Sequence, residues 1–182
     1  MNRLSLRCFA MAMLLAFAGT AFAQGLSIDI TDGSSTADPI AVVPFAFEGA
    51  GLPPETDVSE IVRADLARSG KFFTLGRRDI IEFPTRESEV KFATWRMLKQ
   101  NYLVVGRLAD AGDGALRVEF ELFDVARQSR MMGLAISGQR TAMRDVAHQI
   151  ADLVYEKILG VRGAFWTRIA YVTSVGLGQN TQ

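Results

Sequence analysis

The sequence predicts an α/β (α+β) fold, in which a mixed β-sheet of about five strands carries two to three packed helices. Apolar residues follow strand and helix periods in the order strand, helix, strand, helix, three strands, helix. Tight turns separate the three consecutive strands. An apolar fraction of 49% in 182 residues supplies a well-developed core. We expect the helices to cover one face of the sheet.

The first strand is followed by a loop and a helix. Residues 40–47 begin with a continuous apolar run, as in a strand buried on both faces, and Pro44 weakens the later half. Thr56 or Asp57 marks the start of a helix whose apolar residues recur at helical spacing until Gly70.

A second strand and helix follow. Residues 72–75 form a short apolar strand. Ser88 is a candidate cap for a helix whose apolar residues extend from Val90 to Leu98, and we expect this helix to end near Asn101.

Three extended runs at residues 102–108, 116–125 and 131–137 predict an antiparallel meander. The sequence Gly112-Asp113-Gly114 separates the first two, and residues 126–129 separate the second from the third. The middle run alternates apolar with charged residues, so one side of the meander should face water.

A last long helix has Thr141 as a candidate cap and Gly160 beyond its end. Residues 165–175 then have a strand-like order but no evident partner in the predicted sheet.

The first 23 residues have the three parts of a secretory signal. Arg3 and Arg7 supply positive charge, residues 11–18 are apolar, and Ala21-Phe22-Ala23 is a small-x-small cleavage site that leaves Gln24 as the new amino terminus. The apolar run is too short to cross a bilayer, so we expect no stable membrane insertion after cleavage. Cleavage also removes Cys8, the only cysteine, and with it any disulfide or thiolate nucleophile.

Residues 24–38 form what we call the arm. Leu26, Ile28 and Ile30 alternate with polar residues, as in a strand, and a small, polar stretch then forms a flexible link. Two roles remain open for such a strand: it pairs with the protein's own sheet, or it adds to the sheet edge of a partner.

Chemical motifs are sparse, and we expect no catalytic residue, no metal site, no cofactor and no nucleic-acid partner. His148 is the only histidine and lies beside an apolar helical stripe, which favours a packed or surface residue. Lysine plus arginine balance aspartate plus glutamate at 20 each. The Gly49-Ala50-Gly51 loop lies between a strand and a helix but lacks the remaining residues of a phosphate-binding motif. A small nucleotide-binding or enzymatic domain that uses this loop is the alternative hypothesis.

Four stretches of the sequence resemble the amino-terminal domain of the TolB family, in the family's order. They are DPIAVVPF at residues 38–45, IVRADLARSGKF at residues 61–72, VVG at residues 104–106, and KILGVRGAFWTRIAYV at residues 157–172. They are distributed over most of the chain that follows the export signal.

The resemblance implies a non-enzymatic periplasmic component of the Tol-Pal system, which supports outer-membrane integrity and envelope constriction at cell division. Family members continue into a six-bladed β-propeller that binds the lipoprotein Pal. Residues 169–172 resemble the first propeller strand and the chain ends soon after them, so Pal would be a partner only if the propeller were present. We therefore expect residues 1–23 as signal peptide, 24–38 as arm, 39–162 as α/β domain and 163–182 as the start of the propeller with a tail.

The resemblance also implies a site. In the family, the amino-terminal arm binds the carboxy-terminal domain of TolA by strand addition, which requires alternating side chains that fill pockets. By position, the TolA-binding residues correspond to Gly25, Leu26, Ser27, Ile28, Asp29, Ile30, Thr31, Asp32, Gly33 and Ser34.

Overall fold

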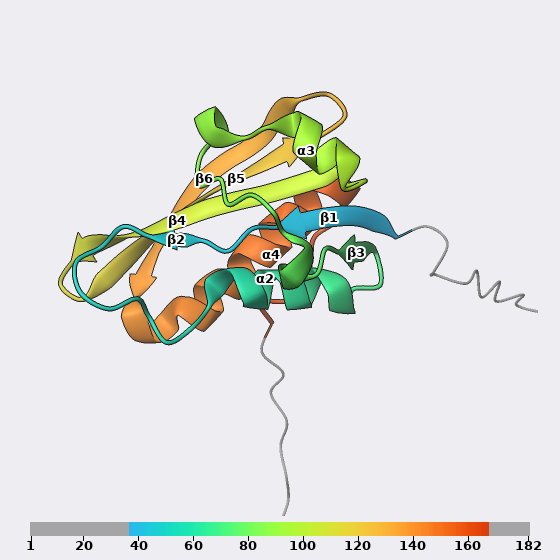
Figure 1. The fold of residues 1–182 in the computed structure, drawn as a ribbon. Helices are drawn as coiled ribbons and strands as arrows, with labels where there is room; N and C mark the ends of the chain where they lie inside the picture. Colours follow the sequence, from blue (N-terminus) through green and yellow to red (C-terminus); the bar gives the residue numbers. More distant parts are fainter. Residues whose placement is uncertain (1–36, 168–182) are drawn as a thin grey trace, which may run out of the picture. The chain divides into compact units, whose positions relative to one another are not determined.

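The fold is known from a computed structural model, which describes residues 37–167 (Figure 1). Its strands are β1 (Asp38–Val42), β2 (Ala46–Phe47), β3 (Phe72–Thr74), β4 (Tyr102–Gly112), β5 (Ala115–Asp124) and β6 (Ser129–Gln139). Its α-helices are α2 (Val58–Arg68), α3 (Phe92–Met97) and α4 (Met143–Leu159), and three short 3₁₀ turns are η1 (Arg77–Asp79), η2 (Glu87–Glu89) and η3 (Arg140–Ala142).

One mixed sheet organises the domain, which confirms the predicted fold class. The strand order is β3-β1-β4-β5-β6, and β2 pairs separately with β4. The pairs of β1 with β3 and with β4 are parallel, whereas β4, β5 and β6 form the predicted antiparallel meander. The sheet has six strands instead of about five because the first predicted strand is interrupted around Pro44 into β1 and β2.

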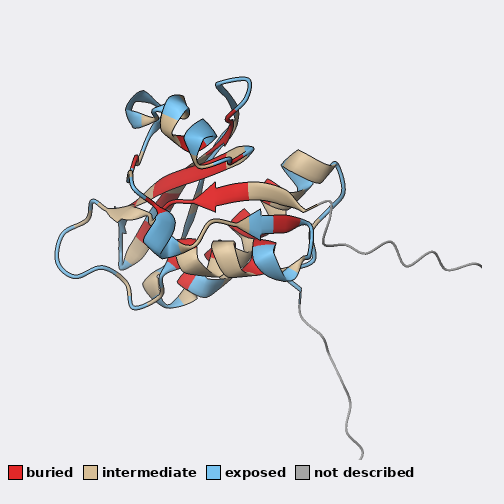
Figure 2. Ribbon diagram, turned by 45° about the vertical axis from the view of Figure 1, so that its right-hand side comes forward, coloured by how far each residue is buried: buried red, intermediate tan, exposed pale blue. Residues whose placement is uncertain are grey.

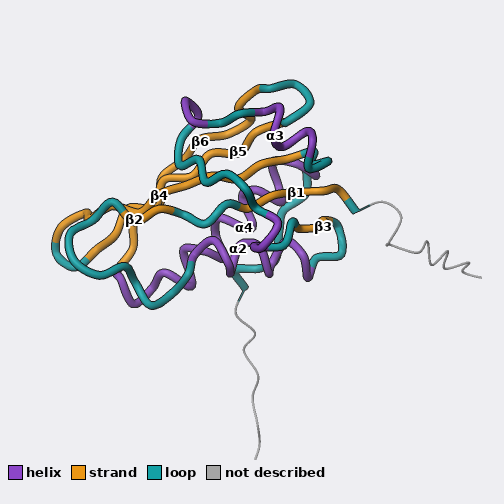
Figure 3. The backbone as a smooth tube through the Cα atoms, viewed as in Figure 1, coloured by secondary structure: helices purple, strands orange, loops and turns teal. Residues whose placement is uncertain are grey.

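Both faces of the sheet are covered, so the expectation that the helices share one face is wrong. Helices α2 and α4 lie on one side of the sheet and the short α3 lies on the other (Figures 1 and 3). Successive residues of β1 point to opposite faces: Ile40 and Val42 belong to the core under α2 and α4, and Ala41 to a smaller core that contains Trp95 of α3. Trp95 is fully buried, so α3 is a necessary cover for this second face.

Helix α2 begins where the sequence predicts. The Asp57 carboxylate accepts a hydrogen bond from the backbone N–H of Glu60 at 3.1 Å and caps the helix. The two other predicted caps are wrong. Ser88 lies in the 3₁₀ turn η2, and α3 begins only at Phe92; Thr141 lies in η3, and α4 begins at Met143. In both places a 3₁₀ turn precedes the α-helix, and neither α-helix has a side-chain cap.

The end of α4 agrees with the sequence prediction. Gly160 has φ of 71°, a left-handed conformation that glycine adopts without strain, and its N–H donates to the carbonyl of Glu156 at 2.8 Å. The hairpin between β4 and β5 turns at Asp113 and Gly114, which both have positive φ, as a two-residue turn of this type requires.

The segment after α4 folds back over the helix. The Asp152 carboxylate accepts hydrogen bonds from the N–H groups of Phe165 at 2.8 Å and Trp166 at 3.0 Å. Close approach requires glycine at residue 163, since an added Cβ would lie 2.9 Å from the Asp152 Cα atom. The described part of the predicted last strand, residues 165–167, is not extended into the sheet, and its remainder lies outside the described residues.

Candidate partner-binding site

The predicted TolA-binding residues, Gly25–Ser34, lie outside the described residues, as do the cleavage-site residues Ala21, Ala23 and Gln24. The structure describes the point at which the arm joins the domain. The arm leads directly into β1, which lies inside the sheet between β3 and β4. Its attachment point is therefore a central strand of the domain.

Asp38 is fixed to both neighbours of β1. Its backbone N–H donates to the carbonyl of Lys71, just before β3, at 2.9 Å. Its carboxylate accepts a hydrogen bond from the side-chain amide of Asn101, just before β4, at 3.1 Å. The Asn101 backbone N–H donates to the carbonyl of Pro39 at 2.9 Å. These contacts fix the position of the start of β1, where the arm joins the domain.

A polar hollow lies beside this attachment point. It has a volume of about 350 Å³ and is lined by Asn101, Tyr102, Asp124, Ala126 and Arg127. Burial raises the pKa of the Tyr102 hydroxyl, and the carboxylates of Asp38 and Asp124 act in the same direction. The hydroxyl therefore stays protonated at neutral pH and can donate a hydrogen bond.

The glycine loop of the alternative hypothesis is already occupied by the protein's own groups. The N–H of Ala50 donates to the Asp110 carboxylate at 2.6 Å. A Cβ at Gly49 would lie 2.5 Å from the Phe47 ring, so this glycine serves a close internal contact. These contacts explain the glycine at residue 49 without a phosphate ligand.

The amino terminus of α2, where a phosphate would bind, holds a carboxylate. Asp57 accepts from Ser59 Oγ at 2.5 Å and pairs with the Arg77 guanidinium at 2.6 Å. Burial acts to raise the pKa of Asp57, but the hydrogen bonds from Ser59, Arg77 and the Glu60 N–H outweigh it, so its pKa lies below the ordinary value. The ionised carboxylate takes the place of an anionic ligand at this helix end.

His148 is a packed residue, one of the two roles that its sequence position favours. Its Nδ1 atom lies 2.5 Å from Oδ2 of Asp65, which is 2% exposed. Asp65 also pairs with Arg68 one turn along α2. The histidine therefore links α4 to α2 through a buried carboxylate.

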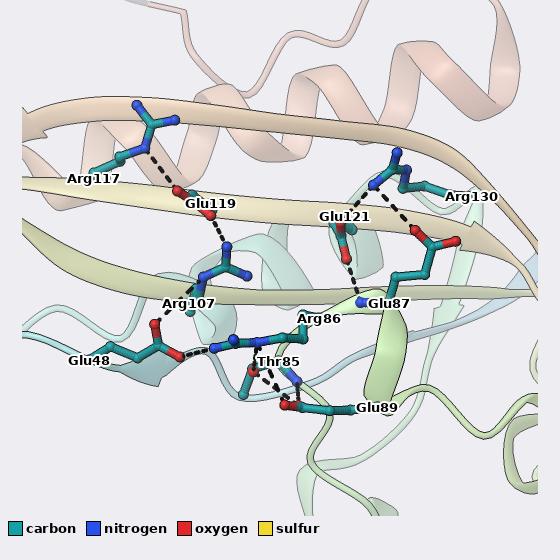
Figure 4. Close-up of polar contacts among 10 residues, drawn as sticks. All are labelled: Glu48, Thr85, Arg86, Glu87, Glu89, Arg107, Arg117, Glu119, Glu121 and Arg130. Carbon is teal, nitrogen blue, oxygen red and sulfur yellow. Dashed lines mark hydrogen bonds and ion pairs between the residues drawn. The ribbon is translucent and has the colours of Figure 1, made fainter.

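An arginine–glutamate network covers the water-facing side of the meander (Figure 4). Glu119 of β5 pairs with Arg117 at 2.9 Å and with Arg107 of β4. The hydrogen bond from Arg117 lowers the pKa of Glu119, burial opposes it, and Arg107 adds to the lowering. Charged side chains thus line an open hollow of about 490 Å³ on this face.

The same network holds the loop before α3 against the sheet. Arg130 of β6 contacts Glu121 at 3.0 Å and Glu87 at 3.3 Å, and the Glu87 N–H donates to Glu121 at 2.7 Å. Arg86 pairs with Glu48, which also lies 3.6 Å from Arg107 (Figure 4). The alternation in β5 predicts a charged face, but the partners from residues 48 and 86–87 are distant in sequence and have no local signal.

Two features are absent from the part of the chain that the structure describes. Within residues 37–167, histidine, cysteine and acidic side chains nowhere gather in a group of three that could hold a metal ion. Across the same range, every helix is too short or too polar to cross a membrane.

Comparison with known proteins gives a consistent result. A family model described as the TolB amino-terminal domain matches residues 26–131. The chain is 62% identical to the Tol-Pal system protein TolB of Xanthomonas euvesicatoria pv. vesicatoria over 167 residues, which is 92% of this chain and 38% of that protein. It is 61% identical to the protein of the same name from Xanthomonas oryzae pv. oryzae over 91% of this chain and 38% of that protein.

A solved structure agrees with these matches. The crystal structure of TolB from Acinetobacter baumannii superposes with a TM-score of 0.60 and 25% identity, and the match covers 71% of this chain and 30% of that one. The chain thus spans well under half the length of the relatives that it matches.

Proposed function

The chain belongs to the TolB amino-terminal domain family, and from this premise we propose that it is a non-enzymatic, periplasmic component of the Tol-Pal system. Its role is to bind protein partners and thereby to support outer-membrane integrity and envelope constriction at cell division. The export signal at residues 1–23 supports the compartment. The carboxylate at the start of α2 weighs against the nucleotide-binding alternative, because it fills the position that a phosphate group would need.

The proposed contact with TolA is strand addition by the arm. The family match begins at Leu26, so it includes almost all of the proposed binding residues Gly25–Ser34. Leu26, Ile28 and Ile30 alternate, so one face of an added strand would place three apolar side chains in partner pockets.

One observation carries this proposal: the family match extends from Leu26 past β1, the internal strand to which the arm is attached. Because β1 is hydrogen-bonded to β3 and to β4, an arm strand that adds to a partner would be attached to a strand held firmly within the sheet. The domain organisation follows as part of the proposal, with the arm at residues 24–38, the α/β domain at 39–162 and the start of a propeller at 163–182.

We assign no Pal binding to the described domain. In the family this contact belongs to the propeller, and the chain covers 38% of its Xanthomonas relatives. A Pal-binding assay with the purified chain should therefore give no saturable signal, whereas a full-length relative should bind.

The decisive experiment measures binding of Gln24–Gln182 to a TolA carboxy-terminal domain by calorimetry. Deletion of Gly25–Ser34 should abolish binding while the unfolding midpoint stays unchanged. Ile28→Asp should weaken binding more than Asp29→Ala, because only one face of an added strand fills pockets. Unchanged affinity after deletion of the arm would refute the proposal.

A further inference from the structure

The last strand of the sheet, β6, has one free edge. β6 has 11 residues and, within the part of the chain that the structure describes, it pairs along its length with β5 alone. Figure 1 shows β6 at the border of the sheet. Alternate N–H and C=O groups of such a strand point away from its neighbour, and they form a template for a further strand.

The free edge lacks most features that normally prevent strand pairing. Residues 131–138 of β6 contain no charged residue and no proline. A bulge is present, but it lies near the start of the strand, where Met131 is the extra residue between Arg130 and Met132. The opposite border strand, β3, has only three residues and offers little length for pairing.

The two faces of β6 differ in the size of their side chains. Met132, Leu134 and Ile136 lie opposite core residues of β5 on the face that α4 covers. Leu134 is nevertheless 45% exposed, although its two neighbours on this face are partly buried against the core. Gly133 and Ala135 lie on the other face of β6, so this face carries only small side chains at the centre of the strand.

This pattern is complementary to itself. In an antiparallel pair centred on Leu134, Met132 would face Ile136 of the second strand, and Leu134 would face its own equivalent. Gly133 would face Ala135 on the face with the small side chains. Residues 131–138 contain no charged residue, so no two like charges would meet across this central segment.

We propose that the free edge of β6 is an interface for a second copy of this chain, joined by antiparallel β6–β6 pairing into one continuous sheet. Loss of Arg3 and Arg7 with residues 1–23 leaves 18 lysine and arginine residues against 20 aspartate and glutamate residues, a formal net charge of −2 that adds only weak long-range repulsion. The central segment of about seven residues on each side is small beside the roughly 1,200 Å² that stable complexes bury. The dimer is therefore weak and forms at micromolar to millimolar concentration.

The test is sedimentation equilibrium of Gln24–Gln182 from about 1 μM to about 1 mM, a span that brackets a weak interface. Wild type should shift from monomer toward dimer as concentration rises. Leu134→Lys and Leu134→Glu should each remain monomeric, because each places like charges opposite one another at the centre of the pair. An equimolar mixture of the two variants should recover the dimer, which only β6–β6 pairing predicts.

Met97→Lys is the matched control, since Met97 is 69% exposed on α3 and adds the same charge away from β6. It should dimerise as wild type does, and thermal melts should show that all variants fold. A wild type that stays monomeric at every concentration would overturn the proposal. So would a dimer that persists in Leu134→Lys, or one that disappears when Gly25–Ser34 is deleted, because the arm would then be the interface.

Discussion

The Nδ1 atom of His148 in α4 lies 2.5 Å from Oδ2 of Asp65 in α2, and this contact joins the two helices that cover the main core. Asp65 is 2% exposed, so its carboxylate depends on protein partners for hydrogen bonds. Arg68, whose side chain is 70% exposed, is the second partner of this carboxylate. The contact gives the single histidine of the chain a structural role.

We predict that Asp65→Ala lowers the free energy of unfolding by about 2 to 4 kcal/mol, since it removes a buried acceptor and leaves His148 without its partner. Urea denaturation at pH 7 measures the change. Glu156→Ala on the exposed side of α4 is the control and should change stability by less than about 0.5 kcal/mol. Equal effects of the two substitutions would show that the helix contact contributes nothing.

A second prediction concerns acid. The pKa of Asp57 is lower in the folded chain than its ordinary value of 3.8, so the ionised carboxylate stabilises the fold above that value, and this contribution is lost as the pH falls through the folded-state pKa. Asp57→Asn keeps the helix cap but does not titrate. Wild type should exceed this variant in stability at pH 7 by less than about 1 kcal/mol, because the pair with Arg77 is half exposed.

That difference should shrink when the pH is lowered from 5 toward 3, and urea midpoints at each pH measure it. Carboxylates distant from Asp57 contribute equally to both proteins and cancel, whereas Glu60 does not, because the charge of Asp57 acts to raise its pKa. A difference that is constant across this range would contradict the assigned role of Asp57.

Two strand glycines should respond oppositely to alanine. A Cβ at Gly106 would lie 2.8 Å from the backbone oxygen of Glu119 and 2.9 Å from the Phe45 ring, so Gly106→Ala should cost about 1 to 3 kcal/mol. Gly133→Ala meets no atom closer than 3.5 Å and should be neutral or slightly stabilising. Thermal unfolding distinguishes them, and a tolerated Gly106→Ala would show that the two strands can separate locally.

The chain after α4 offers a spectroscopic prediction. Asp152→Ala removes the acceptor for two backbone N–H groups, so residues 165–167 should lose their place on the helix. With fluorotryptophan labelling, the ¹⁹F signal of Trp166 should shift and narrow while that of buried Trp95 stays fixed. Arg144→Ala, at an exposed position near the start of the same helix, is the control and should move neither signal.

Local patterns predict much of this fold because their causes are local. The alternation of residues 116–122 corresponds to β5, and Asp57 and Gly160 bound their helices as expected. The Pro44 signal is also local, and the strand does divide around it. Such features depend on backbone geometry within a few residues.

Local patterns fail at the caps expected at Ser88 and Thr141, where a 3₁₀ turn precedes each helix, and the other features that they miss are set by distant contacts. The face that α3 covers is decided by Trp95 packing beside Phe123, which no sequence window contains. The proposed binding residues Gly25–Ser34 lie outside the described part, so this site stays a prediction from the family resemblance. The Arg86–Glu48 pair joins residues 38 positions apart, and charge type alone does not select one partner among 20 acidic residues.

The position of β1 has a mechanical consequence. A pull on the arm would act lengthwise on a strand that is hydrogen-bonded to β3 on one side and β4 on the other. The bonds would then be loaded in shear and would have to break together, whereas a border strand can be peeled off one bond at a time. Forced unfolding is governed by the rate of such a rupture. The start of β1 would therefore resist such a pull more strongly than a border strand would.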